Sequence, residues 1–138
     1  MHVTESAIFV VDDDEAIVDL TTAVLNGAGF TAFGTTDPEE AIRIIETDPS
    51  IKLVLSDLMM PRVTGPELVR RALRVRNGTV RVLFMSGGFD GVPFRNTDRL
   101  LEKPLSIEKL TTEVRRTLAE LPVVTSWEGP ERRRSPQP

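Results

Sequence analysis

Short, wholly apolar runs are the feature of this sequence that most constrains its fold. Residues 7–11 (AIFVV) are rich in β-branched side chains, and residues 53–55 (LVL) form a second apolar run. The first run lacks the polar alternation of a strand with one exposed face, so it is expected to be a strand buried on both faces. Such strands occur in parallel sheets that helices cover on each side, which points to an α/β fold.

An amphipathic helix is expected after the first run. Its apolar residues have the helical spacing i, i+3, i+7, i+8, at Ile17, Leu20, Val24 and Leu25. Gly27 and Gly29 follow, and we expect them to supply the left-handed conformation that ends the helix.

A second helix is expected to begin after Asp37, which has the side chain of an N-cap. Pro38 suits the first helical position and Glu40 the capping-box position. The helix is expected to turn its apolar side chains inward, at Ala41, Ile44 and Ile45, and to stop at Asp48.

Strands and helices alternate about five times along the chain. Further strands are expected over 30–33, 53–57, 80–85 and 100–102, and further helices over 66–76 and from Ser106 to Pro122. This order predicts a doubly wound, five-stranded parallel sheet. Residues 89–98 show no helical period and contain Gly91 and Pro93, so the fourth helix is expected to be shortened or irregular.

Length and composition narrow the class of protein. The 138 residues suit one domain, expected over residues 1–121, and the proline-rich stretch 122–138 is expected to be a flexible tail. The net charge of −4 comes with no basic stripe in the body of the chain, so direct binding of nucleic acid is not expected. The absence of cysteine excludes a disulfide framework and a cysteine nucleophile. No apolar window is long enough for a membrane span, so we expect a cytoplasmic protein.

Polar side chains follow four of the expected strands. They are Asp12 and Asp13 after the first, Asp57 at the end of the third, Ser86 after the fourth and Lys103 after the fifth. In a doubly wound sheet the ligand crevice lies outside the carboxyl ends of the strands. We therefore expect three carboxylates, a hydroxyl and an ammonium group to meet at one edge of the sheet.

This set of groups points to phosphoryl chemistry at a metal site. Clustered carboxylates repel each other unless a cation neutralises them, and all-oxygen ligands favour Mg²⁺ over Mn²⁺ or Ca²⁺. A hydroxyl and a lysine beside such a cation can hold phosphoryl oxygens. The natural reaction is acyl-phosphate formation on Asp57. Taken singly, each residue has an ordinary structural explanation, but their coincidence at four strand ends favours one site.

The same residues give the chain its resemblance to a known family. Val10–Asp13, Asp57–Pro61 with Gly65, Ser86 and Lys103–Pro104 resemble the signature positions of response-regulator receiver domains of two-component signalling. The resemblance covers residues 6–121 and implies a flavodoxin-like (βα)5 fold. Residues 84–87 (FMSG) and 101–104 (LEKP) are similar to the receivers of hybrid histidine kinases.

The resemblance implies a role for each matching residue. Asp57 would accept a phosphoryl group from a phosphohistidine. Asp13, Asp57 and the backbone carbonyl of Met59 would bind Mg²⁺, and Asp12 would assist through water. Ser86 and Lys103 would hold the phosphoryl oxygens. The Lys103–Pro104 bond would be cis, and Gly87 would leave room for phosphotransfer.

Partners also follow from the resemblance. The implied donor is a sensor histidine kinase or a phosphotransfer protein, and the signal would pass to an unknown protein target by direct contact. The chain would not be a conventional enzyme, although it would catalyse its own phosphorylation and dephosphorylation. Whether it stands alone or belongs to a hybrid kinase, and whether it forms a homodimer, stays open.

Two departures from the family affect the signal output. Leu100 stands three residues before the lysine, where the family usually carries an aromatic switch residue. The interval from Ser86 to Lys103 is 103 − 86 = 17 residues, about five shorter than the family pattern. Both changes fall on the surface that commonly reports phosphorylation.

Two other functions are compatible with parts of the pattern. A haloacid-dehalogenase-type phosphatase also uses a strand-end aspartate, and residues 12–14 (DDD) contain its Asp-x-Asp spacing. Glu15 and Ala16 do not continue that motif, and no acidic pair follows Lys103. A degenerate receiver that acts only as a binding module is supported by the altered segment before Lys103 alone.

Overall fold

The computed structural model describes residues 6–76, 80–86, 100–102 and 106–119. Its sheet has five parallel strands in the order β2-β1-β3-β4-β5. The strands are β1 (Ala7–Val11), β2 (Thr31–Thr35), β3 (Ile51–Asp57), β4 (Arg81–Ser86) and β5 (Leu100–Glu102). The helices are α1 (Glu15–Gly27), α2 (Pro38–Thr47), α3 (Gly65–Arg76) and α4 (Ile107–Ala119). The predicted doubly wound parallel sheet is confirmed.

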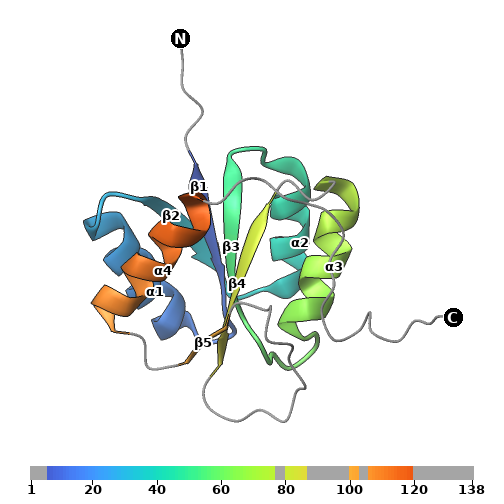
Figure 1. The fold of residues 1–138 in the computed structure, drawn as a ribbon. Helices are drawn as coiled ribbons and strands as arrows, with labels where there is room; N and C mark the ends of the chain where they lie inside the picture. The colour runs from blue at the N-terminus through green and yellow to red at the C-terminus, as the bar shows by residue number, and fades with distance from the viewer. Residues whose placement is uncertain (1–5, 77–79, 87–99, 103–105, 120–138) are drawn as a thin grey trace, which may run out of the picture.

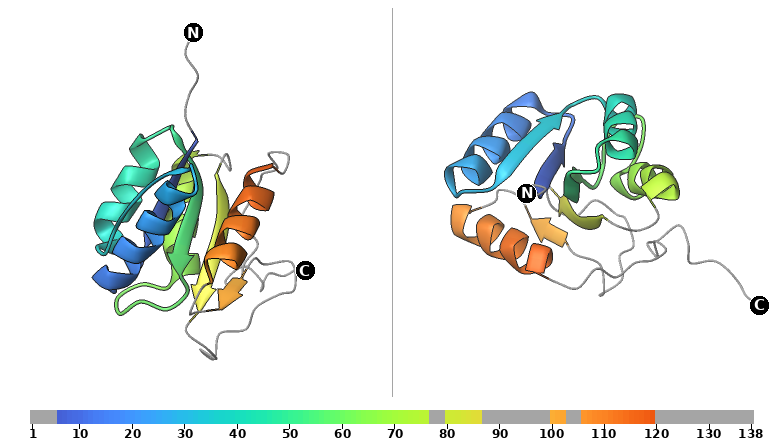
Figure 2. Two further views of the ribbon diagram at one scale, coloured as in Figure 1. Left: turned by 90° about the vertical axis from the view of Figure 1, so that its left-hand side faces the viewer. Right: turned by 90° about the horizontal axis from the view of Figure 1, so that it is seen from above.

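The helices form two layers around the sheet. Helices α1 and α4 cover one face, and α2 and α3 cover the other (Figures 1 and 2). Each layer closes a separate apolar core, because alternate strand residues point to opposite faces. In β3, Leu53 and Leu55 pack with α1 and α4, whereas Val54 packs with α2 and α3. By the same alternation, Asp57 faces the same side of the sheet as Leu53 and Leu55, and Ser56 faces the same side as Val54.

The strand order reverses at β1 and β3. The chain moves from β1 outward to β2, and then crosses back to β3, β4 and β5 on the other side. In sheets of this type the ligand crevice opens at the carboxyl ends of the strands beside this reversal. Asp12 directly follows β1 and Asp57 ends β3, so both lie at that point.

Helix α1 forms where the sequence predicts it but turns a different face inward. Its buried residues are Val18, Thr21 and Leu25, whereas Leu20 is 63% exposed. The predicted stripe was wrong at Leu20, because the fold buries the neighbouring polar Thr21 in its place. Only Gly29, at φ 99°, has the left-handed conformation expected of both glycines, and Gly27 ends the helix itself.

Helix α2 begins as predicted, at Pro38 after the N-cap Asp37, whose carboxylate accepts from the Glu39 N–H at 3.1 Å. The predicted capping box is wrong, because Glu40 does not return to the cap. Its carboxylate accepts from the Thr35 hydroxyl at 2.7 Å, and that hydroxyl accepts from the Asp37 N–H at 3.1 Å. The inward face includes Ile42, which the sequence interpretation omitted, while Ile44 is only partly buried.

The remaining described boundaries either match the predictions, as in β5, or differ by one or two residues. Strand β2 begins at Thr31 and runs to Thr35, instead of 30–33. Several predictions lie outside the described residues: the irregular fourth helix over 89–98, the Lys103–Pro104 bond and the tail from 122. Within the described part of the chain, no helix has the length and hydropathy needed to cross a membrane.

Candidate phosphoacceptor and metal site

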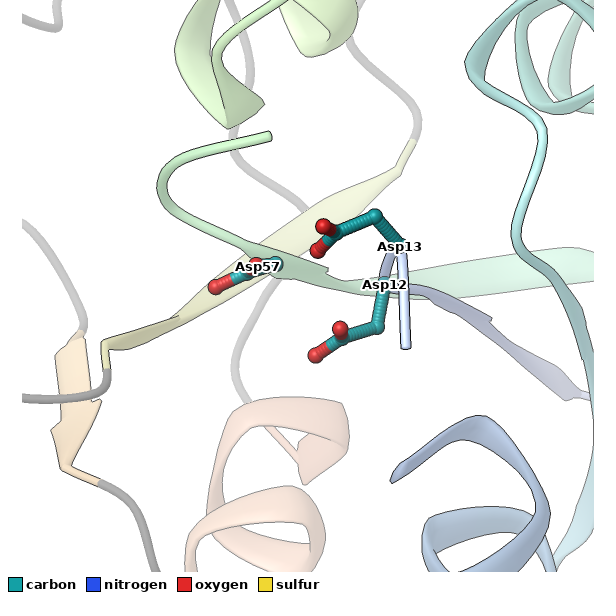
Figure 3. A group of neighbouring side chains, drawn as sticks. All are labelled: Asp12, Asp13 and Asp57. Atoms are coloured by element: carbon teal, nitrogen blue, oxygen red, sulfur yellow. The ribbon is translucent and has the colours of Figure 1, made fainter. Parts of the chain in front are cut away.

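Three carboxylates meet at the carboxyl ends of β1 and β3. Asp57 is 7% exposed and Asp12 is fully buried, whereas Asp13 is exposed. One carboxylate oxygen from each lies within 4.8 Å of the others. Figure 3 shows the three side chains extending from the two strand ends toward a common region. The convergence expected from the sequence is confirmed for these three residues.

The turn after β1 is fixed by the first helix. The Asp12 carboxylate accepts from the Asp14 N–H at 2.9 Å, and the Asp14 carboxylate accepts from the Ala16 N–H at 2.9 Å. Asp14 is thereby the N-cap of α1. Because consecutive hydrogen bonds hold residues 12–16, Asp13 is held at the start of the helix, where the helix dipole favours negative charge.

The loop after β3 is closed at both ends. The Leu58 N–H donates to the Met85 carbonyl at 2.7 Å, and the Leu58 carbonyl accepts from the Gly65 N–H at 2.9 Å. Met59 follows directly, with 40% of its surface exposed. Helix α3 then begins after Thr64, whose hydroxyl accepts from the Glu67 N–H at 3.2 Å.

The donor set fits a hard divalent cation. Two buried carboxylates and one exposed carboxylate repel each other at this separation, and burial strengthens the repulsion. All three offer oxygen atoms, which Mg²⁺ prefers, and the exposed Asp13 leaves the cluster accessible to a hydrated ion. The arrangement is therefore consistent with the Mg²⁺ site expected from the sequence.

Ser86 and Lys103 were also predicted to belong to the site. Ser86 ends β4 and is 2% exposed, and the residue before it, Met85, pairs in register with Asp57. The Ser86 hydroxyl is thus on β4, the strand that pairs with β3 at Asp57. Lys103 lies outside the described residues, so its role stays a prediction, as does metal binding by the Met59 carbonyl.

Sequence reasoning gave no role to Ser56. Its side chain is fully buried, and its hydroxyl donates to the Asp57 carbonyl at 2.9 Å. The available signal was a hydroxyl residue inside an otherwise apolar strand end, directly before the candidate acceptor.

Comparison with known proteins identifies the relatives of this chain. A family model described as "Response regulator receiver domain" matches residues 8–115. The chain is 29% identical to the sensor kinase CckA of Brucella abortus over 119 residues, covering 82% of this chain and 12% of CckA. It is 31% identical to the transcriptional regulatory protein FixJ of Bradyrhizobium diazoefficiens, covering 80% of this chain and 56% of FixJ. The chain therefore spans less than two thirds of either relative.

Solved structures agree with these matches. The crystal structure of the receiver domain from the hybrid histidine kinase CckA is 32% identical, with a TM-score of 0.70, and covers 82% of this chain and 99% of that domain. A CheY-like receiver domain protein from Methanospirillum hungatei has the same TM-score at 24% identity, which supports the fold. The expected similarity to the receiver of a hybrid histidine kinase is confirmed.

Proposed function

The chain belongs to the response regulator receiver domain family, the phosphoacceptor modules of two-component signalling, and we propose that Asp57 is its phosphoacceptor. The observation that carries this assignment is the position of the Asp57 carboxylate. It ends β3 beside the strand-order reversal, is 7% exposed, and lies within 4.8 Å of the Asp12 and Asp13 carboxylates.

The reaction transfers a phosphoryl group to Asp57. A carboxylate oxygen of Asp57 attacks phosphorus in line with the leaving group, a P–O bond forms, and the P–N bond of the donor phosphohistidine breaks. The imidazole nitrogen keeps the electron pair of that bond and takes up a proton. Asp57 needs no base, because its carboxylate is the nucleophile.

Asp12, Asp13 and Asp57, with the Met59 carbonyl, would hold Mg²⁺. When bound, Mg²⁺ neutralises the carboxylates and the charge that builds on the phosphoryl oxygens. Ser86 would donate its hydroxyl proton to one phosphoryl oxygen, and Lys103 would pair with another. The same residues would assist hydrolysis of the acyl phosphate, so the chain would catalyse its own dephosphorylation.

Receiver domains act with histidine kinases or phosphotransfer proteins, and one of these would be the donor here. The protein target, formation of a homodimer and the cytoplasmic location belong to the same proposal. The receiver family is not one of classical enzymes, and no observation favours the haloacid-dehalogenase interpretation. The family match ends at residue 115, and the domain boundary at 121 stays a prediction.

The proposal is tested with acetyl phosphate and Mg²⁺. The intact mass should rise by one phosphoryl group in the wild type and stay unchanged in Asp57→Asn. Asp19→Asn is a matched control, because Asp19 is an exposed aspartate on α1. It should be phosphorylated like the wild type. Equal uptake by Asp57→Asn would contradict the assignment, and multiple turnover of a phosphate ester would favour a phosphatase.

A further inference from the structure

Ser56 is a buried polar residue with a specific partner. It lies in β3 with none of its surface exposed, between Val54 and Leu58, which belong to the core under α2 and α3. Its hydroxyl donates to the carbonyl oxygen of Asp57 at 2.9 Å. A hydroxyl in such an apolar layer is costly unless it is hydrogen-bonded, and here the bond goes to the backbone of the candidate phosphoacceptor.

Gly65 lies close to the same carbonyl oxygen. A Cβ atom added at Gly65 would overlap the Asp57 carbonyl oxygen, and it would also lie 3.0 and 3.1 Å from two ring carbons of Phe84. At position 65, only glycine, which has no side chain, can therefore approach this carbonyl so closely. Phe84 is 1% exposed and packs in the same core. The Asp57 carbonyl is therefore hydrogen-bonded by Ser56 and closely approached by Gly65, and the Phe84 ring packs beside Gly65.

Fixing this carbonyl fixes one peptide plane. The Asp57 C=O and the Leu58 N–H belong to the same planar unit and, in a trans peptide, point in opposite directions. The C=O accepts from Ser56 at 2.9 Å, and the N–H donates to the Met85 carbonyl at 2.7 Å. With both ends held, the plane cannot rotate, so the direction in which the chain continues to Met59 is set.

We propose that Ser56 is a positioning residue for the phosphoacceptor. It acts from the opposite face of the sheet: by strand alternation Ser56 points toward α2 and α3, and Asp57 toward α1 and α4. Its hydroxyl holds the 57–58 peptide plane, which fixes the backbone that carries the Asp57 carboxylate and the start of the segment that carries Met59. This inference rests on the proposed function, because orientation matters only if Asp57 and Met59 are used.

The test compares Ser56→Ala with Thr117→Val in the full chain. Thr117, 2% exposed on α4, is also a buried hydroxyl residue but has no place in the site. Three properties are measured for each: the rate of phosphorylation by acetyl phosphate, the Kd for Mg²⁺ by titration, and the ¹³C chemical shift of the Asp57 carbonyl. Ser56→Cys, which keeps a weak donor, is the second variant if Ser56→Ala does not fold.

Ser56→Ala should lower the phosphorylation rate and Mg²⁺ affinity by about tenfold, as loss of a residue that orients metal ligands typically does. The Asp57 carbonyl signal should move, and Ser56→Cys should fall between alanine and serine. Thr117→Val should leave all three properties unchanged. If Ser56→Ala matches the wild type in rate and Mg²⁺ affinity, the positioning role is refuted.

The two proposals fail in different ways. If the wild type takes up no phosphoryl group, the proposed function is contradicted. In that case, an unchanged Mg²⁺ affinity and carbonyl signal in Ser56→Ala would overturn the role of Ser56 as well, whereas changes in both would support it.

Discussion

Gly65→Ala is the substitution whose effect follows most directly from the geometry of the site. The added methyl group would overlap the Asp57 carbonyl oxygen and press on the Phe84 ring, 3.0 Å away. A flexible side chain could turn aside, but a strand carbonyl held by Ser56 and a fully packed ring cannot. The strain must therefore move the 57–58 peptide or the start of α3.

The magnitude follows from two opposing effects. Overpacking of a rigid site costs about 1–3 kcal/mol, and the upper end applies because one neighbour is backbone. Replacing glycine by alanine recovers less than about 1 kcal/mol of chain entropy, since Gly65 opens the helix. The free energy of unfolding should fall by about 2 kcal/mol, which lowers the urea midpoint by roughly 1 M.

Two other glycines supply matched controls. Alanine at Gly34 in β2 would overlap the Val10 carbonyl and lie 2.9 Å from Val18, away from Asp57. Alanine at Gly27 meets nothing within 4 Å. Gly34→Ala should lose stability like Gly65→Ala, whereas Gly27→Ala should gain about 0.5–1 kcal/mol.

The assay pairs urea unfolding with phosphorylation by acetyl phosphate, measured where all variants are folded. Gly65→Ala should lose both stability and at least tenfold in rate, because about 1 Å of displacement disrupts reaction geometry. Gly34→Ala should lose stability alone. Wild-type stability in Gly65→Ala would refute the packing argument, and equal rates in the two destabilised variants would refute the link to Asp57.

Three further predictions test the metal cluster, a helix cap and the core. Mg²⁺ at ten times its Kd should raise the free energy of unfolding of the wild type by about 1.4 kcal/mol, and Asp13→Asn should abolish this gain in thermal melts without unfolding the chain. An equal gain in both proteins would place the ion elsewhere. Asp37→Ala should cost about 1 kcal/mol by removing the N-cap of α2, and Asp37→Ser should restore most of it, with phosphorylation unchanged in both. Leu55→Ala should cost about 3 kcal/mol in urea unfolding, because Leu55 is fully buried; a cost below 1 kcal/mol would contradict its place in the core.

The fold was predictable because the central strands β1 and β3 are almost entirely buried on both faces. A run such as residues 7–11 has no exposed side to obscure its pattern, and its bounds match β1. Strand β2 is less regular and partly exposed, so its start was misplaced by one residue and its end by two. The inward face of α1 was missed because a hydropathy pattern favours Leu20 over Thr21, whereas the fold buries Thr21 and exposes Leu20.

Local hydrogen bonds explain what else escaped prediction. The N-cap at Asp37 is encoded by adjacent residues and was found, but the partner of Glu40 is Thr35, which belongs to the preceding strand. Tertiary context thus replaced the expected capping box. The acidic cluster was predictable because topology brings strand ends together, whatever the details of the loops.

The turn that carries Asp12 and Asp13 and the backbone of Asp57 are held from opposite faces of the sheet. The carboxylates of Asp12 and Asp14 accept backbone N–H groups at the start of α1, on the side toward which Asp57 points. The Asp57 carbonyl is held by Ser56, which faces α2 and α3. A change in the α2–α3 layer can therefore reach the phosphoacceptor through the 57–58 peptide plane. We therefore expect changes at the start of α1 to alter metal binding through Asp12 and Asp13, and changes on the α2–α3 side of β3 to alter it through the direction of Asp57.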